Sequence, residues 1–192
     1  MVQTGLGRLG AYYFGFEEQG ALPDIVVLGK PIGNGHPIGA VVTTRAISEA
    51  FAQGPEYFST FGGSTLSCRI GAEVLDIVDD EGLLENANLM GARLLSGLRD
   101  LQAVHPVIGD VRGYGLFIGV DLVSDIVTRT PATDAADYVK NRMREHRILL
   151  GCEGPFDNIL KIRPPLTIDE EGVDMILAVL AEVLTEVDTL SA

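Results

Sequence analysis

The sequence has few positive charges, no tryptophan and no long apolar run. Lysine and arginine together number 14 against 27 acidic residues, which gives a formal net charge of −13 at pH 7. A nucleic-acid groove or an anionic membrane surface requires clustered positive charge, so this balance argues against both kinds of partner. No apolar stretch approaches the ~20 residues of a membrane span, and no signal peptide is recognisable at the N-terminus.

Cysteine and histidine are scarce as well. Cys68 and Cys152 lie far apart and form no CxxC pair, which indicates free thiols in a reducing compartment and predicts a cytoplasmic location. The three histidines, His36, His105 and His146, lack the spacing of metal ligands, so we expect no metal site. For His36 we expect a hydrogen bond that stabilises a turn. Cys68 is expected to pack among apolar neighbours.

The first half of the chain predicts a short strand, a glycine-rich loop and two helices. The apolar run Ile25–Leu28 is typical of a strand buried on both faces, as in parallel sheets. Helical spacing of apolar residues begins at Ser64, is interrupted at Gly82 and resumes up to residue 101. The pair His105-Pro106 breaks the chain. We therefore predict two parts, residues 1–104 and residues 105–192.

The second half predicts further strands and helices, which gives an α/β layout. Candidate strands are Gly115–Val123, Ile148–Leu150 and Asn158–Ile162. Thr133 and Asp134 are expected to cap one helix. Thr167-x-x-Glu170 matches a capping box for the last helix.

Gly5-Leu6-Gly7-Arg8-Leu9-Gly10 matches the dinucleotide fingerprint G-x-G-x-x-G letter for letter. The fingerprint functions only after a strand and before a helix, and only four residues precede this match. We therefore interpret it as an ordinary turn.

Lys30 is one of only three lysines, with Lys140 and Lys161. It follows the apolar run Ile25–Leu28, and a loop with several glycines follows it. The carboxyl ends of buried strands in open α/β sheets face the ligand crevice. Burial there would disfavour the charged amine and lower its pKa, as a Schiff-base lysine requires. A solvated surface charge is the simpler alternative.

The stretch Ser59–Ser64 (STFGGS) supplies hydroxyls, flexible backbone and a helix start. Such a combination suits a phosphate group, because free backbone N–H groups and hydroxyls converge there. An ordinary loop has the same composition. Lys30 and this stretch together suggest an aldehyde cofactor that carries a phosphate.

Several segments resemble the class III (ω-type) aminotransferases, fold type I enzymes that use pyridoxal phosphate (PLP). They are VQTGLGRLG at residues 2–10, PDIVVLGKPIGNG at 23–35, STFGG at 59–63 and GDVRGYG at 109–115. Residues 148–166 are similar to the branch that contains alanine–glyoxylate aminotransferase 2 and the ethanolamine-phosphate phospho-lyases. The implied fold is the C-terminal part of fold type I, with part of the large-domain sheet and a smaller α+β C-terminal domain.

The resemblance implies a role for each matching residue. Lys30 would form the Schiff base with PLP and afterwards shuttle the substrate proton. Gln3 would hydrogen-bond the phenolic oxygen of the cofactor, and Val2 would pack on the ring. Thr60 would bind the phosphate of the cofactor in the neighbouring subunit, which implies a homodimer. Lys161 falls where many members carry a carboxylate-binding arginine. Arg163 lies two residues further on the same strand face, so either cation could meet an anionic substrate group.

The N-terminal half of the family's enzymes has no counterpart in this sequence. The acidic partner of the pyridine nitrogen would stand before the first residue, and Met1 takes the place of a glutamate. We therefore expect the C-terminal portion of a longer enzyme, inactive by itself. The leading hypothesis is amino transfer between an amine or amino acid and a 2-oxo acid. The alternatives are a PLP-dependent amino-phosphate phospho-lyase and a catalytically silent fragment that dimerises.

Overall fold

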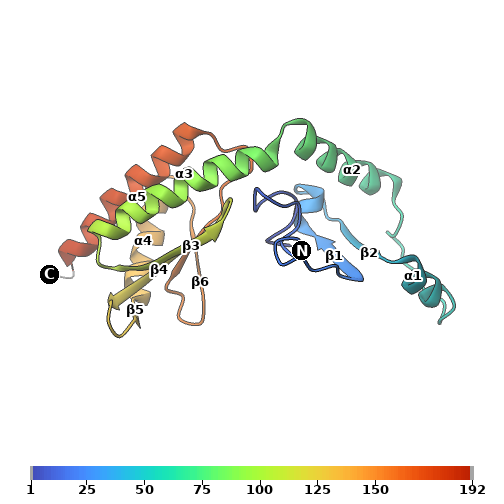
Figure 1. Cartoon of the computed structure of the whole chain (residues 1–192), viewed down its shortest axis with the longest axis horizontal. Coiled ribbons are helices and arrows are strands. Elements are labelled where there is room, and N and C mark those ends of the chain that lie inside the picture. Colours follow the sequence, from blue (N-terminus) through green and yellow to red (C-terminus); the bar gives the residue numbers. More distant parts are fainter. Residues whose placement is uncertain (1, 191–192) are drawn as a thin grey trace. The chain divides into compact units, whose positions relative to one another are not determined.

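The computed structural model describes residues 2–190, and the chain divides into two compact units, Met1–Leu84 and Glu85–Ala192 (Figure 1). Helix α3 (Leu83–Val104) lies almost entirely in the second unit. Its apolar stripe packs in the core of that unit, which is why the boundary between the units falls in the first turn of the helix. The domain division expected at residue 105 stays a prediction. Among residues 2–190, no helix combines the length and apolarity needed to cross a bilayer.

The first unit contains a hairpin of β1 (Ile25–Gly29) and β2 (Gly39–Thr43), joined through a short 3₁₀ helix, η1 (Lys30–Gly33). Helices α1 (Arg45–Ala52) and α2 (Thr65–Asp80) follow. The predicted start of α2 is confirmed, because the Ser64 side chain accepts a hydrogen bond from the backbone N–H of Ser67.

The expected burial of β1 is wrong. The strand forms where the β-branched run predicted it, but it pairs antiparallel with β2 rather than joining a parallel sheet. Ile25 and Val27 expose 53% and 57% of their surface. The physical reason is that no element among residues 2–190 covers both faces of this two-stranded hairpin. Its apolar residues therefore reflect strand propensity without enclosure.

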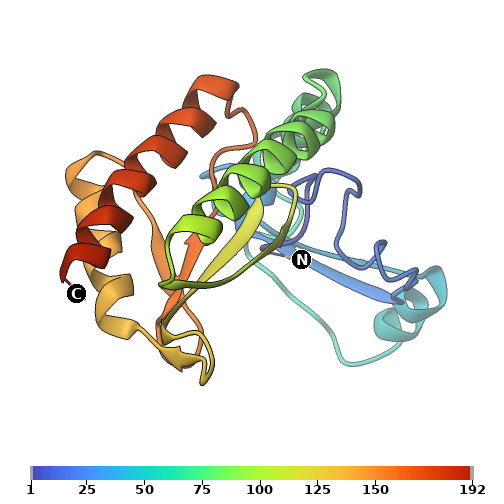
Figure 2. The same ribbon diagram turned by 60° about the vertical axis from the view of Figure 1, so that its left-hand side comes forward.

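The second unit has two layers, one formed by a sheet and the other by three helices. The antiparallel sheet has the order β3 (Ile108–Tyr114), β4 (Phe117–Asp125), β7 (Ile159–Ile162) and β6 (Gly151–Glu153), and β5 (Thr130–Pro131) pairs with β4. Helices α3, α4 (Thr133–Glu145) and α5 (Glu170–Leu190) pack on one face (Figure 2). Alternate strand residues enter this core, including the cross-strand pairs Ile118–Ile162 and Val120–Leu160.

Two predicted helix caps are wrong in detail. Helix α4 begins at Thr133 itself, with Ala132 at the cap position, and the Thr133 hydroxyl donates to the carbonyl of Phe156 instead. At the start of α5, the Asp169 carboxylate accepts from the backbone N–H of Gly172. An aspartate directly before the helix reaches the free N–H groups better than the expected Thr167, which lies two residues earlier.

Helices α4 and α5 are joined by a charged cluster around Glu186. Arg142 donates Nε and Nη2 to the two carboxylate oxygens of Glu186, both at 2.8 Å, and the Tyr138 hydroxyl donates to Oε2, also at 2.8 Å. These contacts with Arg142 and then Tyr138 lower the pKa of Glu186 to about 2. A two-pronged arginine–carboxylate pair fixes orientation as well as charge.

We expect this cluster to make the stability depend on pH at acid pH. The folded pKa of Glu186 lies below its unfolded value of 4.5, so its contribution is full above that value and declines as the pH falls towards about 2. Glu186→Gln should therefore lower urea resistance at pH 7, and the deficit should shrink at pH 3. Glu182→Gln, an exposed change on the same helix, is the control. A deficit that is the same at both pH values would contradict the expectation.

Candidate active site

Lys30 stands where β1 ends and η1 begins, as the sequence predicted. Its backbone lies in the left-handed region, with φ of 46°. A non-glycine residue held there costs about 1–2 kcal/mol, so the surrounding structure must impose the conformation. Its side chain is exposed.

The loop after Lys30 is fixed by its packing on α2. Ile32 is buried, and a Cβ on Gly33 would lie 2.5 Å from Cγ2 of Ile38. A Cβ on Gly71 of α2 would lie 3.3 Å from Cδ1 of the same Ile38. The predicted hydrogen bond of His36 is present and joins its Nε2 to the hydroxyl of Ser67, at 2.9 Å. Lys30 therefore projects from an anchored loop.

The sequence-based expectation of a buried Lys30 is wrong. The residue is exposed because the short β1–β2 hairpin beside it carries no covering layer within the described residues. Cys68 is also exposed rather than packed in a core.

Thr60 lies in the exposed loop that leads into α2. The Ser59 hydroxyl accepts from the backbone N–H of Gly62 at 3.1 Å, which forms a local turn around Thr60. The Ser64 side chain caps the helix. The predicted stretch of hydroxyls before a helix start is therefore present, with Thr60 at the surface.

Val2 and Gln3 are both exposed at the start of the described chain, and Met1 lies outside the described residues. The glycine-rich match at residues 5–10 forms turns, and Leu6 and Leu9 are buried. A Cβ on Gly7 would meet Cδ1 of Leu84 at 2.6 Å. Packing against Leu84, rather than a dinucleotide, therefore explains the glycine at position 7.

Lys161 and Arg163 belong to the second unit. Lys161 lies on β7 and forms an ion pair with Glu153 of the adjacent strand β6. Burial, and then the positive charge of Arg163, lower the pKa of Lys161. The expectation that both cations lie on one strand holds only for Lys161, because β7 ends at Ile162 and Arg163 follows it. Glu153 was not identified from the sequence, because strand register decides which carboxylate faces the lysine.

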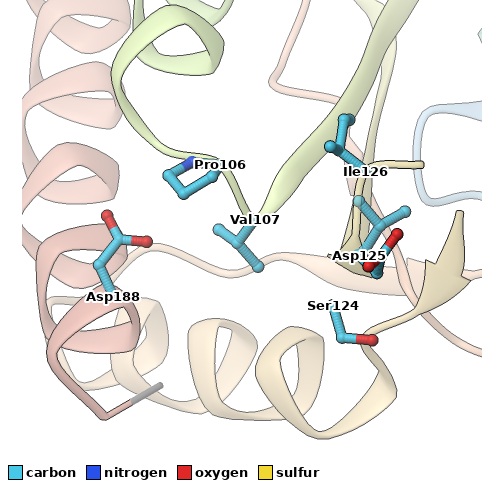
Figure 3. A pocket seen from close by; sticks show the side chains of 7 residues that line it. Pro106, Val107, Ser124, Asp125, Ile126 and Asp188 are labelled. Atoms are coloured by element: carbon cyan, nitrogen blue, oxygen red, sulfur yellow. The ribbon is translucent and has the colours of Figure 1, made fainter. Parts of the chain in front are cut away.

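A separate cavity in the second unit contains none of the expected site residues (Figure 3). It lies between the turn after α3 at Pro106, the end of β4 at Asp125 and the last turns of α5 at Asp188. Asp188 is already paired with Nδ1 of His105 at 2.6 Å, and Asp125 accepts from two backbone N–H groups of its own turn. This cavity is not a candidate for the PLP site. No cluster of three potential ligands for a metal ion occurs in the described part of the chain.

Comparison with known proteins gives a consistent result. The family described as Aminotransferase class-III matches residues 1–184. The Drosophila melanogaster protein named alanine–glyoxylate aminotransferase 2-like is 46% identical over 97% of this chain and 38% of its own length. The Caenorhabditis elegans ethanolamine-phosphate phospho-lyase homolog 1 is 45% identical over 96% of this chain and 40% of its own length.

A solved structure of an Arthrobacter phospholyase in complex with phosphoethanolamine aligns with a TM-score of 0.92 and 38% identity. The alignment covers 95% of this chain and 43% of the phospholyase. The chain thus spans 38% to 40% of the length of the curated relatives named above. The expected α/β fold and the resemblance to PLP-dependent fold type I enzymes are confirmed. The chain belongs to the class III aminotransferase family.

Proposed function

We propose that this chain carries the cofactor lysine of a PLP-dependent aminotransferase, which moves an amino group between an amine or amino acid and a 2-oxo acid. The observation that supports this most is Lys30. It is one of three lysines, is exposed, and is held with a left-handed backbone on a loop that is packed against α2. An unfavourable backbone conformation that the surrounding structure maintains points to a functional position.

The chemistry of the first unit suits PLP. An exposed primary amine at Lys30 can condense with an aldehyde, and the exposed Thr60 hydroxyl lies in a turn before a capped helix. The first residues contribute the amide of Gln3 and the apolar side chain of Val2, both exposed. These residue types match the aldehyde, phosphate, phenolic oxygen and ring of the cofactor. The fit is therefore one of residue type: an amine, a hydroxyl, an amide and an apolar side chain.

When bound, PLP supplies a conjugated ring that accepts the electron pair released from a substrate carbon. Lys30 would hold the cofactor through its Nζ, and that amine would then move a proton to and from the substrate Cα. Gln3 would orient the ring by a hydrogen bond, and Val2 would exclude water from one ring face. Lys161 or Arg163 would bind the anionic group of the substrate.

We propose a homodimer, because Thr60 would bind the cofactor phosphate held by a second copy of the chain. Sedimentation of the purified protein tests this assembly. A cytoplasmic location is also part of the proposal, and the two widely separated free cysteines support it. Fractionation of cells that produce the protein tests the location.

The second candidate function is elimination of phosphate from an amino phosphate. Its support is the match to the Arthrobacter phospholyase and the C. elegans phospho-lyase homolog. The deciding experiment supplies PLP and phosphoethanolamine, with and without a 2-oxo acid. We expect the chain to be inactive by itself, so the assay is informative when product forms: a new amino acid that appears only with the 2-oxo acid would favour the aminotransferase. Phosphate release without the 2-oxo acid would favour the lyase. The absence of both products would favour a catalytically silent fragment.

A further inference from the structure

The loop after Lys30 contains the one asparagine–glycine pair of the sequence, Asn34-Gly35. The pair lies at the centre of a tight turn, because the backbone N–H of His36 donates to the carbonyl of Gly33 at 2.9 Å. Both central residues have a positive φ, 42° at Asn34 and 103° at Gly35. This combination is typical of a type I′ turn, for which Asn-Gly is a preferred pair.

The side-chain amide of Asn34 and the backbone N–H of Gly35 are both open to solvent. Both residues are exposed. Within residues 2–190, the Gly35 N–H donates no hydrogen bond, and the Asn34 side-chain amide makes none. Apart from the neighbours of Gly35 in the chain, no heavy atom of that range lies within 4 Å of where a Cβ on Gly35 would stand. Water therefore reaches both groups.

The turn can bring the Gly35 nitrogen to the side-chain carbon of Asn34. Bond formation between these two atoms needs Cβ of Asn34 and the Gly35 nitrogen on the same side of the Cα–C bond. A type II′ turn provides this arrangement, because ψ at its first central residue is about −120°. Asn34 has ψ of 49°, so a flip of the peptide plane that follows it produces the required angle. The flanking chain stays in place, and glycine accepts the reversed φ.

The other four asparagines of the sequence lack this combination. The Asn86 amide donates to two backbone carbonyls, at 2.7 and 2.9 Å. The amides of Asn141 and Asn158 donate to carboxylates. Asn88 is exposed like Asn34, but it lies inside α3 and precedes a leucine. A helical backbone holds the next N–H group in a hydrogen bond. Asn88 is therefore a matched control for exposure.

We propose that Asn34 is a site of spontaneous deamidation in the folded protein, with water as the only co-reactant. The Gly35 nitrogen forms a bond to Cγ of Asn34, and the bond from Cγ to Nδ2 breaks. The displaced amide group takes up the proton of the Gly35 N–H and leaves as ammonia. Water then opens the cyclic imide at either carbonyl, which gives aspartate or isoaspartate. No atom is oxidised or reduced, and no step depends on the function proposed above.

The two products change the loop in different ways. Aspartate adds a negative charge but tolerates a left-handed backbone much as asparagine does. Isoaspartate adds a methylene group to the main chain, so the turn no longer holds the His36 N–H against the carbonyl of Gly33. The His36 side chain also binds Ser67 of α2. Isoaspartate therefore loosens the attachment of the loop that carries Lys30.

Incubation of the whole chain at pH 8, followed by peptide mass spectrometry, tests the site. We expect Asn34 to be converted while Asn88 stays intact. A parallel incubation in guanidinium chloride gives the rate for the unfolded chain, and the folded chain should react within about tenfold of that rate. Both chains must adopt the same ψ at Asn34, and the folded turn keeps its hydrogen bond in doing so. Conversion of Asn34 no faster than that of Asn88 in the folded chain would overturn the proposal.

Asn34→Gln should remove the product, because the longer side chain would have to close a larger ring. Methyl transfer by a protein isoaspartyl methyltransferase detects the isoaspartate. Amide hydrogen exchange at His36 then tests the effect on the loop. Exchange should be about tenfold faster in the isoaspartate chain than in Asn34→Asp, which carries the same charge without the extra methylene. Equal exchange in these two chains would show that isoaspartate does not loosen the loop.

Discussion

Gly91→Ala should destabilise the second unit by about 3 kcal/mol, the largest loss we expect from adding a single methyl group. A Cβ on this buried residue of α3 would lie 2.3 Å from the carbonyl oxygen of Gly115, and 2.4 and 2.6 Å from its C and Cα atoms. Those atoms are backbone in the turn between β3 and β4, so no side-chain rotation relieves the overlap. Urea unfolding followed by circular dichroism measures the loss.

Gly97 on the same helix provides the matched control. The three atoms nearest to a Cβ there all belong to the Leu177 side chain, with Cδ1 at 2.3 Å, and a leucine can change its rotamer. Alanine also favours the helix over glycine by about 0.5–1 kcal/mol. Gly97→Ala should therefore lie within about 1 kcal/mol of the parent chain. If Gly91→Ala were no less stable than Gly97→Ala, α3 would not contact the β3–β4 turn in the way described.

The helices were largely predictable because their apolar spacing is a local property. Ala87, Met90, Leu94 and Leu98 recur at three- and four-residue intervals, and all are buried on one face of α3. Gly82 adopts a left-handed backbone between α2 and α3, with φ of 62°, as a glycine break predicts. The serine before α2 also caps it, because capping depends on residues adjacent in sequence.

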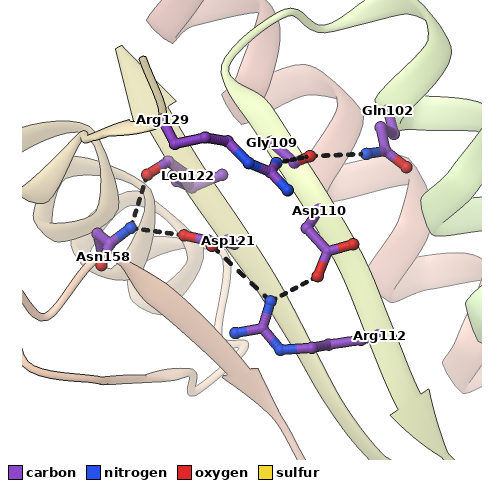
Figure 4. A network of polar contacts seen from close by, with 8 residues as sticks. All are labelled: Gln102, Gly109, Asp110, Arg112, Asp121, Leu122, Arg129 and Asn158. Carbon is purple, nitrogen blue, oxygen red and sulfur yellow. Dashed lines mark hydrogen bonds and ion pairs between the residues drawn. The ribbon is translucent and has the colours of Figure 1, made fainter. Parts of the chain in front are cut away.

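Burial and strand pairing were not predictable in the same way. The apolar sequence Ile25–Leu28 predicted a strand, yet whether another layer covers it depends on distant segments, and here the strand is exposed. Strand β3 was missed because Gly109 and Gly113 obscure its alternating pattern. Gly109 accepts hydrogen bonds from Gln102 and Arg129 through its carbonyl, contacts that only the folded chain creates (Figure 4).

The candidate site also combines features that the sequence predicts with features that only the folded chain determines. The position of Lys30 at a strand end followed from the sequence, because an apolar run and a glycine-rich loop are local signals. Its exposure did not follow, since that is a property of the surrounding layers. The pairing of Lys161 with Glu153 depends on the register of β6 and β7. A change of one residue in that register would place these side chains on the opposite face.

Among the three lysines, Lys30 alone should form a stable adduct when the chain is mixed with PLP and reduced with borohydride. Its amine is exposed. Lys140 is hydrogen-bonded to Asp137, which raises its pKa and keeps the amine protonated. Peptide mass spectrometry after proteolysis locates the adduct. Lys30→Ala should abolish the label, whereas Lys140→Ala should leave it unchanged.

Lys161 is the lysine to compare with Lys30 in this test. Burial and the charge of Arg163 lower its pKa, so on amine chemistry alone it should react with an aldehyde more readily than Lys140. Labelling that follows intrinsic reactivity would therefore include Lys161. Labelling confined to Lys30 would instead follow exposure, because the Lys161 side chain is only 19% exposed and is paired with Glu153. A second aldehyde is therefore needed to test recognition of the cofactor. Pyridoxal without phosphate separates recognition of the cofactor from exposure of the amine. It should label Lys30 much less than PLP does if Thr60 and its turn bind the phosphate, and equal labelling by both aldehydes would contradict that role.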